Sequence, residues 1–288
     1  MVARILDGKA LSARLRARVR QRAEAIAQHG LQPGLAVVLV GENPASQLYV
    51  NNKVRACAES GVRSLRYNLP RQTSETELLA LICRLNADEQ VHGILVQLPL
   101  PDHIDVRRVL ETIAIEKDVD GFHAQNVGHL TLGHPRLPSC TPAGVMALLD
   151  DAGIDPAGKN AVVIGASNIV GKPMALMLLS RGATVTVCHA QTRDLTQHTV
   201  LADIVVVAAG CPKLVQKQMI QSGAVIVDVG INRLPDGSIV GDVDFDQVKT
   251  KAGWISPVPG GVGPMTVTML MENTLRAAEY HQSARLAE

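Results

Sequence analysis

Residues 160–171 read NAVVIGASNIVG, and the fold class of the second half of the chain follows from this stretch. Ala161–Ile164 form a short apolar, β-branched run, which is typical of a buried strand in a parallel sheet. Gly165 and Gly171 then flank a turn into a helix, where backbone amides and a helix N-terminus can hold a pyrophosphate. The pattern departs from the common G-x-G-x-x-G, because Ser167 stands at the second glycine and the last glycine comes one residue late. We expect nucleotide binding, with a plain structural turn as the alternative.

Strand-like and helix-like stretches alternate on both sides of this turn. Downstream, three runs predict buried strands: TVTVCH (184–189), ADIVVVAAG (202–210) and AVIVDVG (224–230). Upstream, LAVVLVG (35–41) and HGILVQ (92–97) have the same character, a helix is expected from about Lys9 to Gln28, and the capping box Ser74-x-x-Glu77 opens another. This alternation indicates an α/β fold with parallel sheets and right-handed crossovers.

The order of these patterns predicts two α/β domains. The first covers residues 1–140 and is joined by the C-terminal helix, at about 267–288. The second is a Rossmann-type nucleotide-binding domain over residues 141–266, in which Thr141 is expected to cap the first helix and Thr266 the last one. Residues 113–140 show no clear period and predict a connector with a site loop.

The composition excludes several classes of protein. Hydrophobic residues make up 47% of the 288 residues and charged residues 19%, which predicts a well-packed globular protein. The formal net charge is +1 without a basic run, so we expect neither nucleic acid nor a membrane surface as a partner. No apolar run of about 18 residues and no signal-peptide pattern occurs.

The cysteines and histidines give no sign of a metal site. The five cysteines are scattered without a C-x-x-C pair, and the nine histidines show no metal-binding spacing. We therefore expect no metal, no disulfide framework and a reducing, cytoplasmic compartment.

Residues 44–57, PASQLYVNNKVRAC, predict a helix that carries a candidate catalytic pair. Asn43 can cap this helix, and Pro44 suits its first turn because no amide bond is lost there. Tyr49 and Lys53 stand four residues apart and so on one face. They form a proton-handling pair if a cleft lowers the lysine pKa toward neutrality; a solvated lysine beside a half-buried tyrosine is the alternative.

Two further polar features lie near predicted strand ends. Gln97 ends the strand pattern HGILVQ, and the carboxyl ends of parallel strands are where open α/β sheets bind their ligands. Its neutral amide can bond a lysine amine without the negative charge that would raise the lysine pKa. Asp118 and Asp120 place two carboxylates in one loop, where they either bind N–H groups of a heterocycle or act as ordinary turn residues.

The second half offers a cofactor signal and a stiff loop. Cys188–Arg193 contain no Asp or Glu that would bond a ribose 2′-hydroxyl. Thr192 and Arg193 suit a 2′-phosphate instead, which favours NADP over NAD, with a plain surface arginine as the alternative. The loop PVPGGVGPMT (257–266) combines stiff prolines with glycines that allow close approach of a flat ligand, and it predicts a ligand clamp or a stiff hairpin turn.

Taken together, these stretches resemble the bifunctional methylenetetrahydrofolate dehydrogenase/methenyltetrahydrofolate cyclohydrolase family. The resemblance covers nearly the whole chain and rests on seven motifs in the family's order and spacing: VGENPASQLYVNNKVRAC, GILVQLPLP, KDVDGFH, CTPAG, VIGASNIVGKPM, VDVGIN and PVPGGVGPMT. It implies two α/β domains around a cleft, usually in a homodimer, with NADP on the C-terminal domain and the folate substrate between the domains. The implied reactions are oxidation of 5,10-methylenetetrahydrofolate to the methenyl form and its hydrolysis to 10-formyltetrahydrofolate.

The resemblance also implies roles for individual residues. Lys53 is the implied catalytic lysine, Tyr49 its neighbour in the folate site, and Gln97 the residue that tunes and orients it. Further implied folate contacts are Leu98, Asp120, Pro259, Gly260 and Gly261. The implied cofactor contacts are Gly165, Ala166, Ser167, Ile169, Val170, His189, Thr192, Arg193, Gly230, Ile231 and Thr266.

Two residues depart from the family pattern. Many relatives have arginine where this chain has Ala166, and a basic or hydroxyl residue where it has Ala190. Both changes thin the positive charge around a 2′-phosphate, so either Arg193 or Lys172 compensates, or NADP binds more weakly, or NAD is also accepted. The competing interpretations are another two-domain Rossmann dehydrogenase, a folate dehydrogenase without the hydrolysis step, and a nucleotide-binding regulatory protein without turnover.

Overall fold

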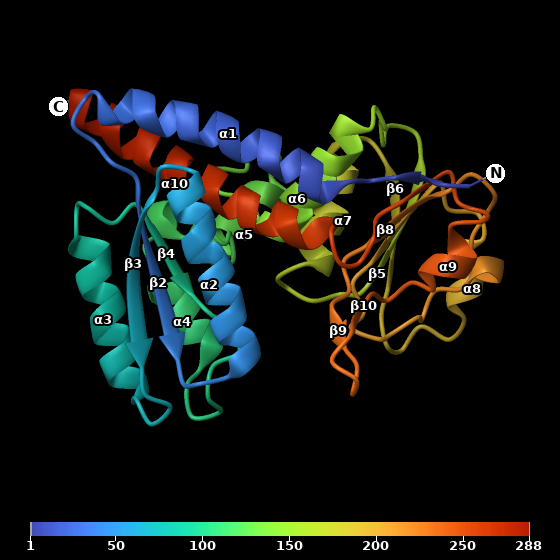
Figure 1. Ribbon diagram of the computed structural model, residues 1–288, viewed down its shortest axis with the longest axis horizontal. Helices are drawn as coiled ribbons and strands as arrows, with labels where there is room; N and C mark the ends of the chain where they lie inside the picture. Colours follow the sequence, from blue (N-terminus) through green and yellow to red (C-terminus); the bar gives the residue numbers. More distant parts are fainter. Residues whose placement is uncertain (1, 288) are drawn as a thin grey trace. The chain divides into compact units, whose positions relative to one another are not determined.

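The structure, a computed structural model, describes residues 2–287 and divides into two compact units (Figure 1). The six-stranded unit comprises the described residues up to Ser12 together with Thr141–Thr266. The three-stranded unit comprises Ala13–Cys140 together with the described residues from Val267 onward. Residues 2–12 therefore belong to the six-stranded unit, although the sequence predicted that they would join the first domain.

All strands in the sheet of the six-stranded unit run parallel. Across the sheet they lie in the order β1 (Arg4–Ile5), β11 (Trp254–Ile255), β8 (Val225–Asp228), β7 (Ile204–Val207), β5 (Asn160–Ile164) and β6 (Thr184–Cys188). From β5 the chain passes through α7 (Gly171–Ser180) to β6, and then crosses to β7 on the other side of β5. The carboxyl ends of β5 and β7 therefore form the topological switch point, where open α/β sheets bind ligands.

Short elements and an aliphatic core complete this unit. The other elements are α6 (Cys140–Asp151), α8 (Leu195–Thr199), η2 (Lys217–Met219), the antiparallel pair β9 (Asn232–Arg233) and β10 (Ile239–Val240), and α9 (Phe245–Val248). Side chains from the central strands, among them Val162, Val205 and Ile226, pack in one buried cluster. Aliphatic strands buried on both faces are what a parallel sheet covered by helices requires.

Three details of this unit differ from the sequence predictions. β6 is an edge strand with exposed residues at Thr184, Thr186 and Val187, so the prediction of a buried strand was wrong. Thr141 is not a cap, because α6 already begins at Cys140. Thr266 is not a cap either, because α10 (Val262–Ala287) begins a full turn earlier, and the two threonine hydroxyls bond each other at 3.0 Å.

The three-stranded unit has a smaller parallel sheet. β2 (Gly34–Val40) is completely buried between β3 (Arg63–Leu69) and β4 (Gly93–Val96). Around it lie the later part of α1 (Gly8–Ala27), α2 (Pro44–Glu59), α3 (Glu75–Ala87), α4 (Val106–Thr112), η1 (Ile115–Lys117), α5 (Ala124–Thr131) and the later part of α10. Successive residues of β2 join different buried clusters, Val37 with Leu270 of α10 and Val38 with Leu78 of α3. This alternation is the two-residue period of a strand with both faces covered.

Several helix ends follow the sequence closely. The side chain of Asn43 accepts the amide of Ser46 at 3.1 Å and so caps α2 as predicted. The predicted capping box of Ser74 and Glu77 is present at the start of α3. By contrast, the predicted connector at 113–140 contains η1 and α5, which the sequence analysis missed.

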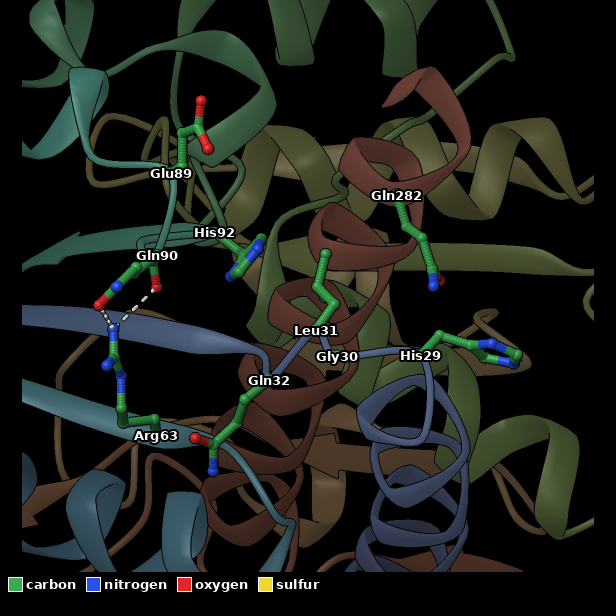
Figure 2. A pocket seen from close by; sticks show the side chains of 9 residues that line it. All are labelled: His29, Gly30, Leu31, Gln32, Arg63, Glu89, Gln90, His92 and Gln282. Atoms are coloured by element: carbon green, nitrogen blue, oxygen red, sulfur yellow. Dashed lines mark hydrogen bonds between the residues drawn. The ribbon is translucent and has the colours of Figure 1, made fainter. Parts of the chain in front are cut away.

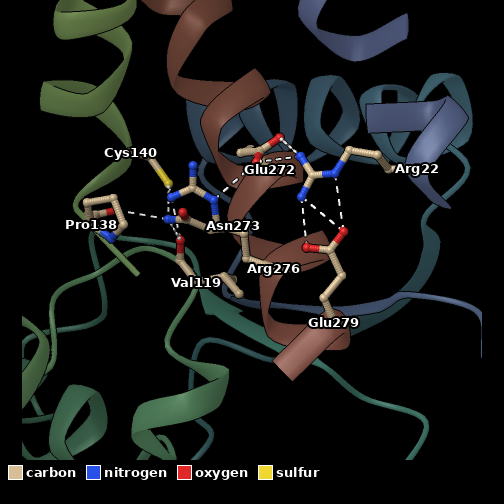
Figure 3. Close-up of polar contacts among 8 residues, drawn as sticks. All are labelled: Arg22, Val119, Pro138, Cys140, Glu272, Asn273, Arg276 and Glu279. Carbon is tan, nitrogen blue, oxygen red and sulfur yellow. Dashed lines mark hydrogen bonds and ion pairs between the residues drawn. The ribbon is translucent and has the colours of Figure 1, made fainter. Parts of the chain in front are cut away.

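α1 and α10 lie side by side in the three-stranded unit (Figures 1 and 3). Arg22 of α1 forms two ion pairs with α10, to Glu272 at 2.7 Å and to Glu279 at 2.8 Å. Planar guanidinium groups suit such paired carboxylates, and these contacts fix the pairing of the two helices.

Candidate active site

The amine of Lys53 and the amide of Gln97 form a hydrogen bond in the three-stranded unit. Lys53 lies on α2 and Gln97 directly follows β4. The Lys53 Nζ donates to Gln97 Oε1 at 2.9 Å, while the Gln97 Nε2 donates to the carbonyl of Leu98 at 2.6 Å. The second bond orients the amide so that its oxygen faces the lysine. Both side chains are partly buried, which removes the alternative of a fully solvated lysine.

Tyr49 lies one helical turn before Lys53 on α2 and is 39% exposed. Its hydroxyl has no hydrogen-bond partner within residues 2–287. The bond of Lys53 thus goes to Gln97, and Tyr49 stands beside this pair with its hydroxyl available to a ligand.

The two carboxylates of the loop after η1 have different environments. Asp118 is buried and accepts the amides of Phe122 at 3.2 Å and His123 at 2.8 Å, and the side-chain amide of Asn126 at 2.8 Å. It is therefore a turn residue. The Asp120 carboxylate has no hydrogen bond within the described part of the chain and is the member of the pair that can bind a ligand.

The charge of Asp120 is sensitive to its surroundings. Burial raises the pKa of Asp120 to about 6; the positive charge of Lys53 acts in the opposite direction, and the nearby Asp118 adds a small further rise. The charge of Lys53 therefore bears on the ionisation of Asp120. Lys53, Gln97 and Asp120 thus form one group of polar side chains.

In the six-stranded unit, the glycine turn after β5 is built by close backbone contacts. Gly165 has φ +123°, and a Cβ there would lie 2.2 Å from the carbonyl oxygen of Ala208 after β7. A Cβ at Gly171 would lie 2.0 Å from the carbonyl oxygen of Gly165. Only glycine fits these positions, as expected where a strand turns tightly into a helix below a bound pyrophosphate.

The start of α7 fits a dinucleotide. The Ser167 hydroxyl accepts the amides of Val170 at 3.2 Å and Gly171 at 3.4 Å, which shapes the turn. Ser167 and Ile169 are exposed beside this helix N-terminus, at the switch point of the sheet. Residues 165–170 are therefore the ones that would hold the phosphates of a nucleotide, because a helix N-terminus favours anions.

The loop after β6 carries one unpaired cation. The Thr192 hydroxyl accepts the amide of His189 at 3.0 Å, so it shapes the loop. Arg193 is exposed and has no polar partner within the described residues, whereas Lys172 bonds Asn168 at 2.7 Å. Of the two residues that could compensate for Ala166 and Ala190, Arg193 is the one whose side chain has no hydrogen bond among the described residues.

Two buried carboxylates, which the sequence analysis did not select, organise the carboxyl edge of this sheet. Asp242 Oδ2 accepts the amides of Ala209 at 2.7 Å and Gly210 at 2.8 Å. Asp228 accepts the amides of Gly230, Asp242 and Val243, each at 2.9 Å. Burial raises the pKa of Asp228 to about 6, although these amides oppose the rise. A carboxylate that ends an apolar strand, as in AVIVD, was the available signal for Asp228; Asp242 had none.

The proline–glycine loop also belongs to the six-stranded unit. Gly260 has φ +112°, and its carbonyl accepts the amide of Lys9 at 2.9 Å. The amide of Gly261 bonds the carbonyl of Pro257 at 2.8 Å. Pro259 is exposed at the tip, and Ile231 after β8 is 47% exposed. The loop is thus a tight turn against the start of α1, and it leaves Pro259 accessible.

A separate pocket of about 910 Å³ lies in the three-stranded unit (Figure 2). Its lining includes Arg63 and His92, at the amino ends of β3 and β4, and none of the predicted site residues. Ligands of open α/β sheets bind at the opposite, carboxyl ends, so this pocket is not the candidate site. Within residues 2–287, no three His, Cys, Asp or Glu side chains gather as a metal-binding group, and no helix has the length and apolar character for crossing a membrane.

Comparison with known proteins identifies the family. The tetrahydrofolate dehydrogenase/cyclohydrolase models match in two parts, the catalytic domain over residues 6–120 and the NAD(P)-binding domain over residues 139–282. The bifunctional protein FolD of Polynucleobacter asymbioticus is 60% identical over 279 residues, which are 97% of this chain and 98% of the relative. The chain belongs to the tetrahydrofolate dehydrogenase/cyclohydrolase family. It is an enzyme with both activities of this family, so the resemblance and the two-domain α/β fold class predicted from the sequence are confirmed.

Solved structures of family members agree with the fold. A bifunctional FolD enzyme from Campylobacter jejuni is 56% identical and superposes with a TM-score of 0.95, covering 96% of this chain and 98% of the other. The Trypanosoma brucei enzyme, solved in complex with NADP cofactor and inhibitor, is 38% identical with a TM-score of 0.94 and covers 99% of each chain. Membership of this family excludes the unrelated dehydrogenase and the regulatory protein without turnover.

Proposed function

We propose that this family member oxidises 5,10-methylenetetrahydrofolate with NADP and hydrolyses the methenyl product to 10-formyltetrahydrofolate, using Lys53, Gln97 and Asp120 of the three-stranded unit. The observation that carries the proposal is the 2.9 Å hydrogen bond from the Lys53 amine to the Gln97 amide oxygen. It places a partly buried amine at the carboxyl edge of a parallel sheet, and the nearby Asp120 carboxylate has no hydrogen bond among the residues that the structure describes. Tyr49 and Leu98 adjoin this pair and complete the folate contacts on this unit.

The hydrolysis step needs a group that moves protons. Water adds to the cationic methenyl carbon and loses one proton to the Lys53 amine, which acts as the general base. The bond from that carbon to N5 then breaks as the new hydroxyl becomes the formyl carbonyl. The hydroxyl loses its proton and N5 gains a proton. Together with the proton lost by water, one proton is released overall. Gln97 orients the amine through the 2.9 Å hydrogen bond and places no negative charge beside it.

The oxidation step needs a binding site more than a proton carrier. NADP, when bound, accepts the hydride that leaves the methylene carbon. Asp120 accepts N–H groups of the pterin ring and so fixes the folate in place.

The six-stranded unit supplies the cofactor contacts. The residues that contact the cofactor phosphates in this proposal are Gly165, Ala166, Ser167, Ile169 and Val170. Other parts of the cofactor contact His189, Gly230, Ile231 and Thr266. The solved complex of the Trypanosoma brucei enzyme with NADP supports the choice of cofactor. Arg193 and Thr192 hold the 2′-phosphate, since Arg193 is an exposed cation without an internal partner. Pro259, Gly260 and Gly261 are further folate contacts that the family resemblance implies.

Initial-rate assays with the purified protein test this function. We expect NADPH to appear with methylenetetrahydrofolate and NADP, NAD to support a lower rate, and separately supplied methenyltetrahydrofolate to be hydrolysed. Arg193→Ala is expected to raise the KM for NADP about tenfold and to leave the KM for NAD unchanged, because charged hydrogen bonds contribute about 1.5–3 kcal/mol. A strong preference for NAD would contradict the cofactor assignment. NADPH formation without methenyl hydrolysis would leave only the dehydrogenase.

The same proposal includes a cytoplasmic homodimer. Support comes from the family resemblance and from the free state of every cysteine that the structure describes. Light scattering during size-exclusion chromatography is expected to give twice the mass of 30.7 kDa.

A further inference from the structure

The loop that presents Asp120 is held from a distant part of the chain. Asn273 lies on α10 and is buried, with 2% of its surface exposed. Its Nδ2 donates to the carbonyls of Val119 at 2.9 Å and Pro138 at 2.8 Å (Figure 3). One side chain thus ties together two loop segments, and the residue directly after Val119 is Asp120.

A thiol supports the same carbonyl. Cys140 Sγ donates to the carbonyl oxygen of Val119 at 3.1 Å and lies 3.6 Å from Asn273 Nδ2. Burial, and then the negative charge of Asp120, raise the pKa of Cys140 well above its ordinary value, so the sulfur keeps the proton that it donates. The carbonyl of Val119 therefore has two buried donors.

The rest of the loop is equally constrained. Gly121 has φ +73°, and a Cβ there would lie 2.5 Å from the amide nitrogen of Ser139. The Asp118 carboxylate accepts hydrogen bonds from the amides of Phe122 and His123 and from the side chain of Asn126. Among the polar side chains of residues 118–121, Asp120 is thus the one that the loop leaves without an internal partner.

We propose that Asn273 is a positioning residue, which holds the Val119 carbonyl so that the Asp120 carboxylate points at the folate. This inference rests on the folate-binding role of Asp120 proposed above. Within the described residues the hydrogen bonds of the Asn273 side chain go to Val119, Pro138 and Cys140, so we infer that it acts on the substrate through the loop. Its effect is expected on folate binding and not on the nicotinamide cofactor, because the loop and the glycine turn belong to different units.

A double-mutant cycle distinguishes positioning from a general structural effect. We expect Asp120→Ala to raise the KM for methylenetetrahydrofolate at least tenfold, and Asn273→Ala to raise it about fivefold to tenfold, with the KM for NADP within twofold of the native enzyme. In the Asp120→Ala background, Asn273→Ala is expected to change the folate KM by less than about twofold. Thr274→Ala is the matched control, since the Thr274 hydroxyl is buried and, among the described residues, bonds the carbonyl of Leu270 on its own helix, at 2.8 Å.

Each outcome bears on a different statement. Multiplicative effects of the two substitutions, an unchanged folate KM in Asn273→Ala, or an equal rise for folate and NADP would overturn the positioning role alone. An unchanged folate KM in Asp120→Ala would contradict the proposed function of Asp120 and, with it, this inference. Should Asn273→Ala fail to fold, Asn273→Ser keeps a donor on a side chain one bond shorter and is measured in the same cycle. It is expected to show a smaller rise that also disappears without Asp120.

Discussion

Asp118 and Asp120 stand two residues apart, yet their carboxylates have different partners in the fold. The Asp118 carboxylate accepts hydrogen bonds from N–H groups that follow it in the chain, whereas the Asp120 carboxylate accepts none among the described residues. The sequence showed two equivalent acids and left both uses open. The path of the backbone, which turns sharply at Gly121 against residues 138–139, decides which of the two acids is used within the loop.

The raised pKa of Asp120 predicts a pH dependence of folate binding. Its pKa of about 6 means that the carboxylate becomes protonated as the pH falls through 6 and then loses the charge that attracts N–H donors. We expect the KM for methylenetetrahydrofolate to be constant from pH 7 to 8 and to rise below pH 6. The measurement is the folate KM of native enzyme and Asp120→Asn across this range. The variant should have a high KM without the inflection near pH 6; an inflection that survives in Asp120→Asn would assign it to another group.

At the scale of elements, the strand–turn–helix of residues 160–180 combines two kinds of constraint. Gly165 has a positive φ, and a side chain there would meet the carbonyl oxygen of Ala208. Strain and overpacking each cost about 1–3 kcal/mol in such places. We therefore expect Gly165→Ala to lower the free energy of unfolding by about 2–4 kcal/mol and to weaken NADPH binding at least tenfold.

Gly153→Ala is the control for this prediction. Gly153 also has a positive φ, of +67°, but no atom lies within 4 Å of the place where its Cβ would be. Strain without a clash should cost about 1 kcal/mol and leave NADPH affinity unchanged. Thermal unfolding and fluorescence titration with NADPH measure both quantities. Equal losses of affinity in the two variants would show that the contact with Ala208 is not what matters.

The start of β4 predicts a loss of stability in acid. His92 is buried, and its Nδ1 accepts the amide of Gly34 at 3.1 Å. Burial, helped by the positive charges of His281, Lys117 and Arg63, lowers the pKa of His92 from 6.5 to about 4. Between pH 6.5 and 4, His92 thus binds a proton in the unfolded chain but not in the folded protein. The free energy of unfolding therefore decreases as the pH falls through this window.

His92→Asn isolates this effect, because asparagine retains an acceptor for the Gly34 amide and cannot ionise. Between pH 7 and 4.5 the native protein should lose on the order of 2 kcal/mol more unfolding free energy than the variant, after allowance for screening by water. Urea unfolding at both pH values gives the comparison. Asp120 and Asp228 are present in both proteins, so their contributions to the pH dependence of stability cancel in the comparison. Identical losses in the two proteins would contradict the lowered pKa of His92.

Local sequence predicted the elements that depend on local chemistry. The apolar runs of β2, β4, β5, β7 and β8 and the caps of α2 and α3 appear where the patterns placed them. Burial of β6, the caps at Thr141 and Thr266, and helix α5 were mispredicted or missed, because edge position and helix starts depend on distant neighbours. Helix and strand patterns placed Lys53 and Gln97 where they could meet, and the structure shows their hydrogen bond; the catalytic roles came from the family resemblance and remain predictions. Asn273 was not predicted, since its bond to Val119 spans 154 residues.

At the scale of the whole molecule, the predicted catalytic residues and the predicted nucleotide-binding turn lie in different units. The three-stranded unit carries the acid–base group around Lys53, and the six-stranded unit carries the glycine turn. In the proposed function, both activities use the group around Lys53, and only the oxidation uses the glycine turn. Conditions that weaken the nucleotide turn should therefore affect the dehydrogenase before the cyclohydrolase, which is the pattern expected for Gly165→Ala.

The central claim is that the Lys53 amine moves protons in the hydrolysis, and Lys53→Gln tests it most directly. Both activities are measured in the folded variant, as methenyl hydrolysis and as NADPH formation. Because general acid–base catalysis contributes about a hundredfold to ten-thousandfold, hydrolysis should fall by that factor, while hydride transfer, which moves no proton, should stay within about tenfold of the native rate. Methenyl hydrolysis at the native rate in folded Lys53→Gln would contradict the claim.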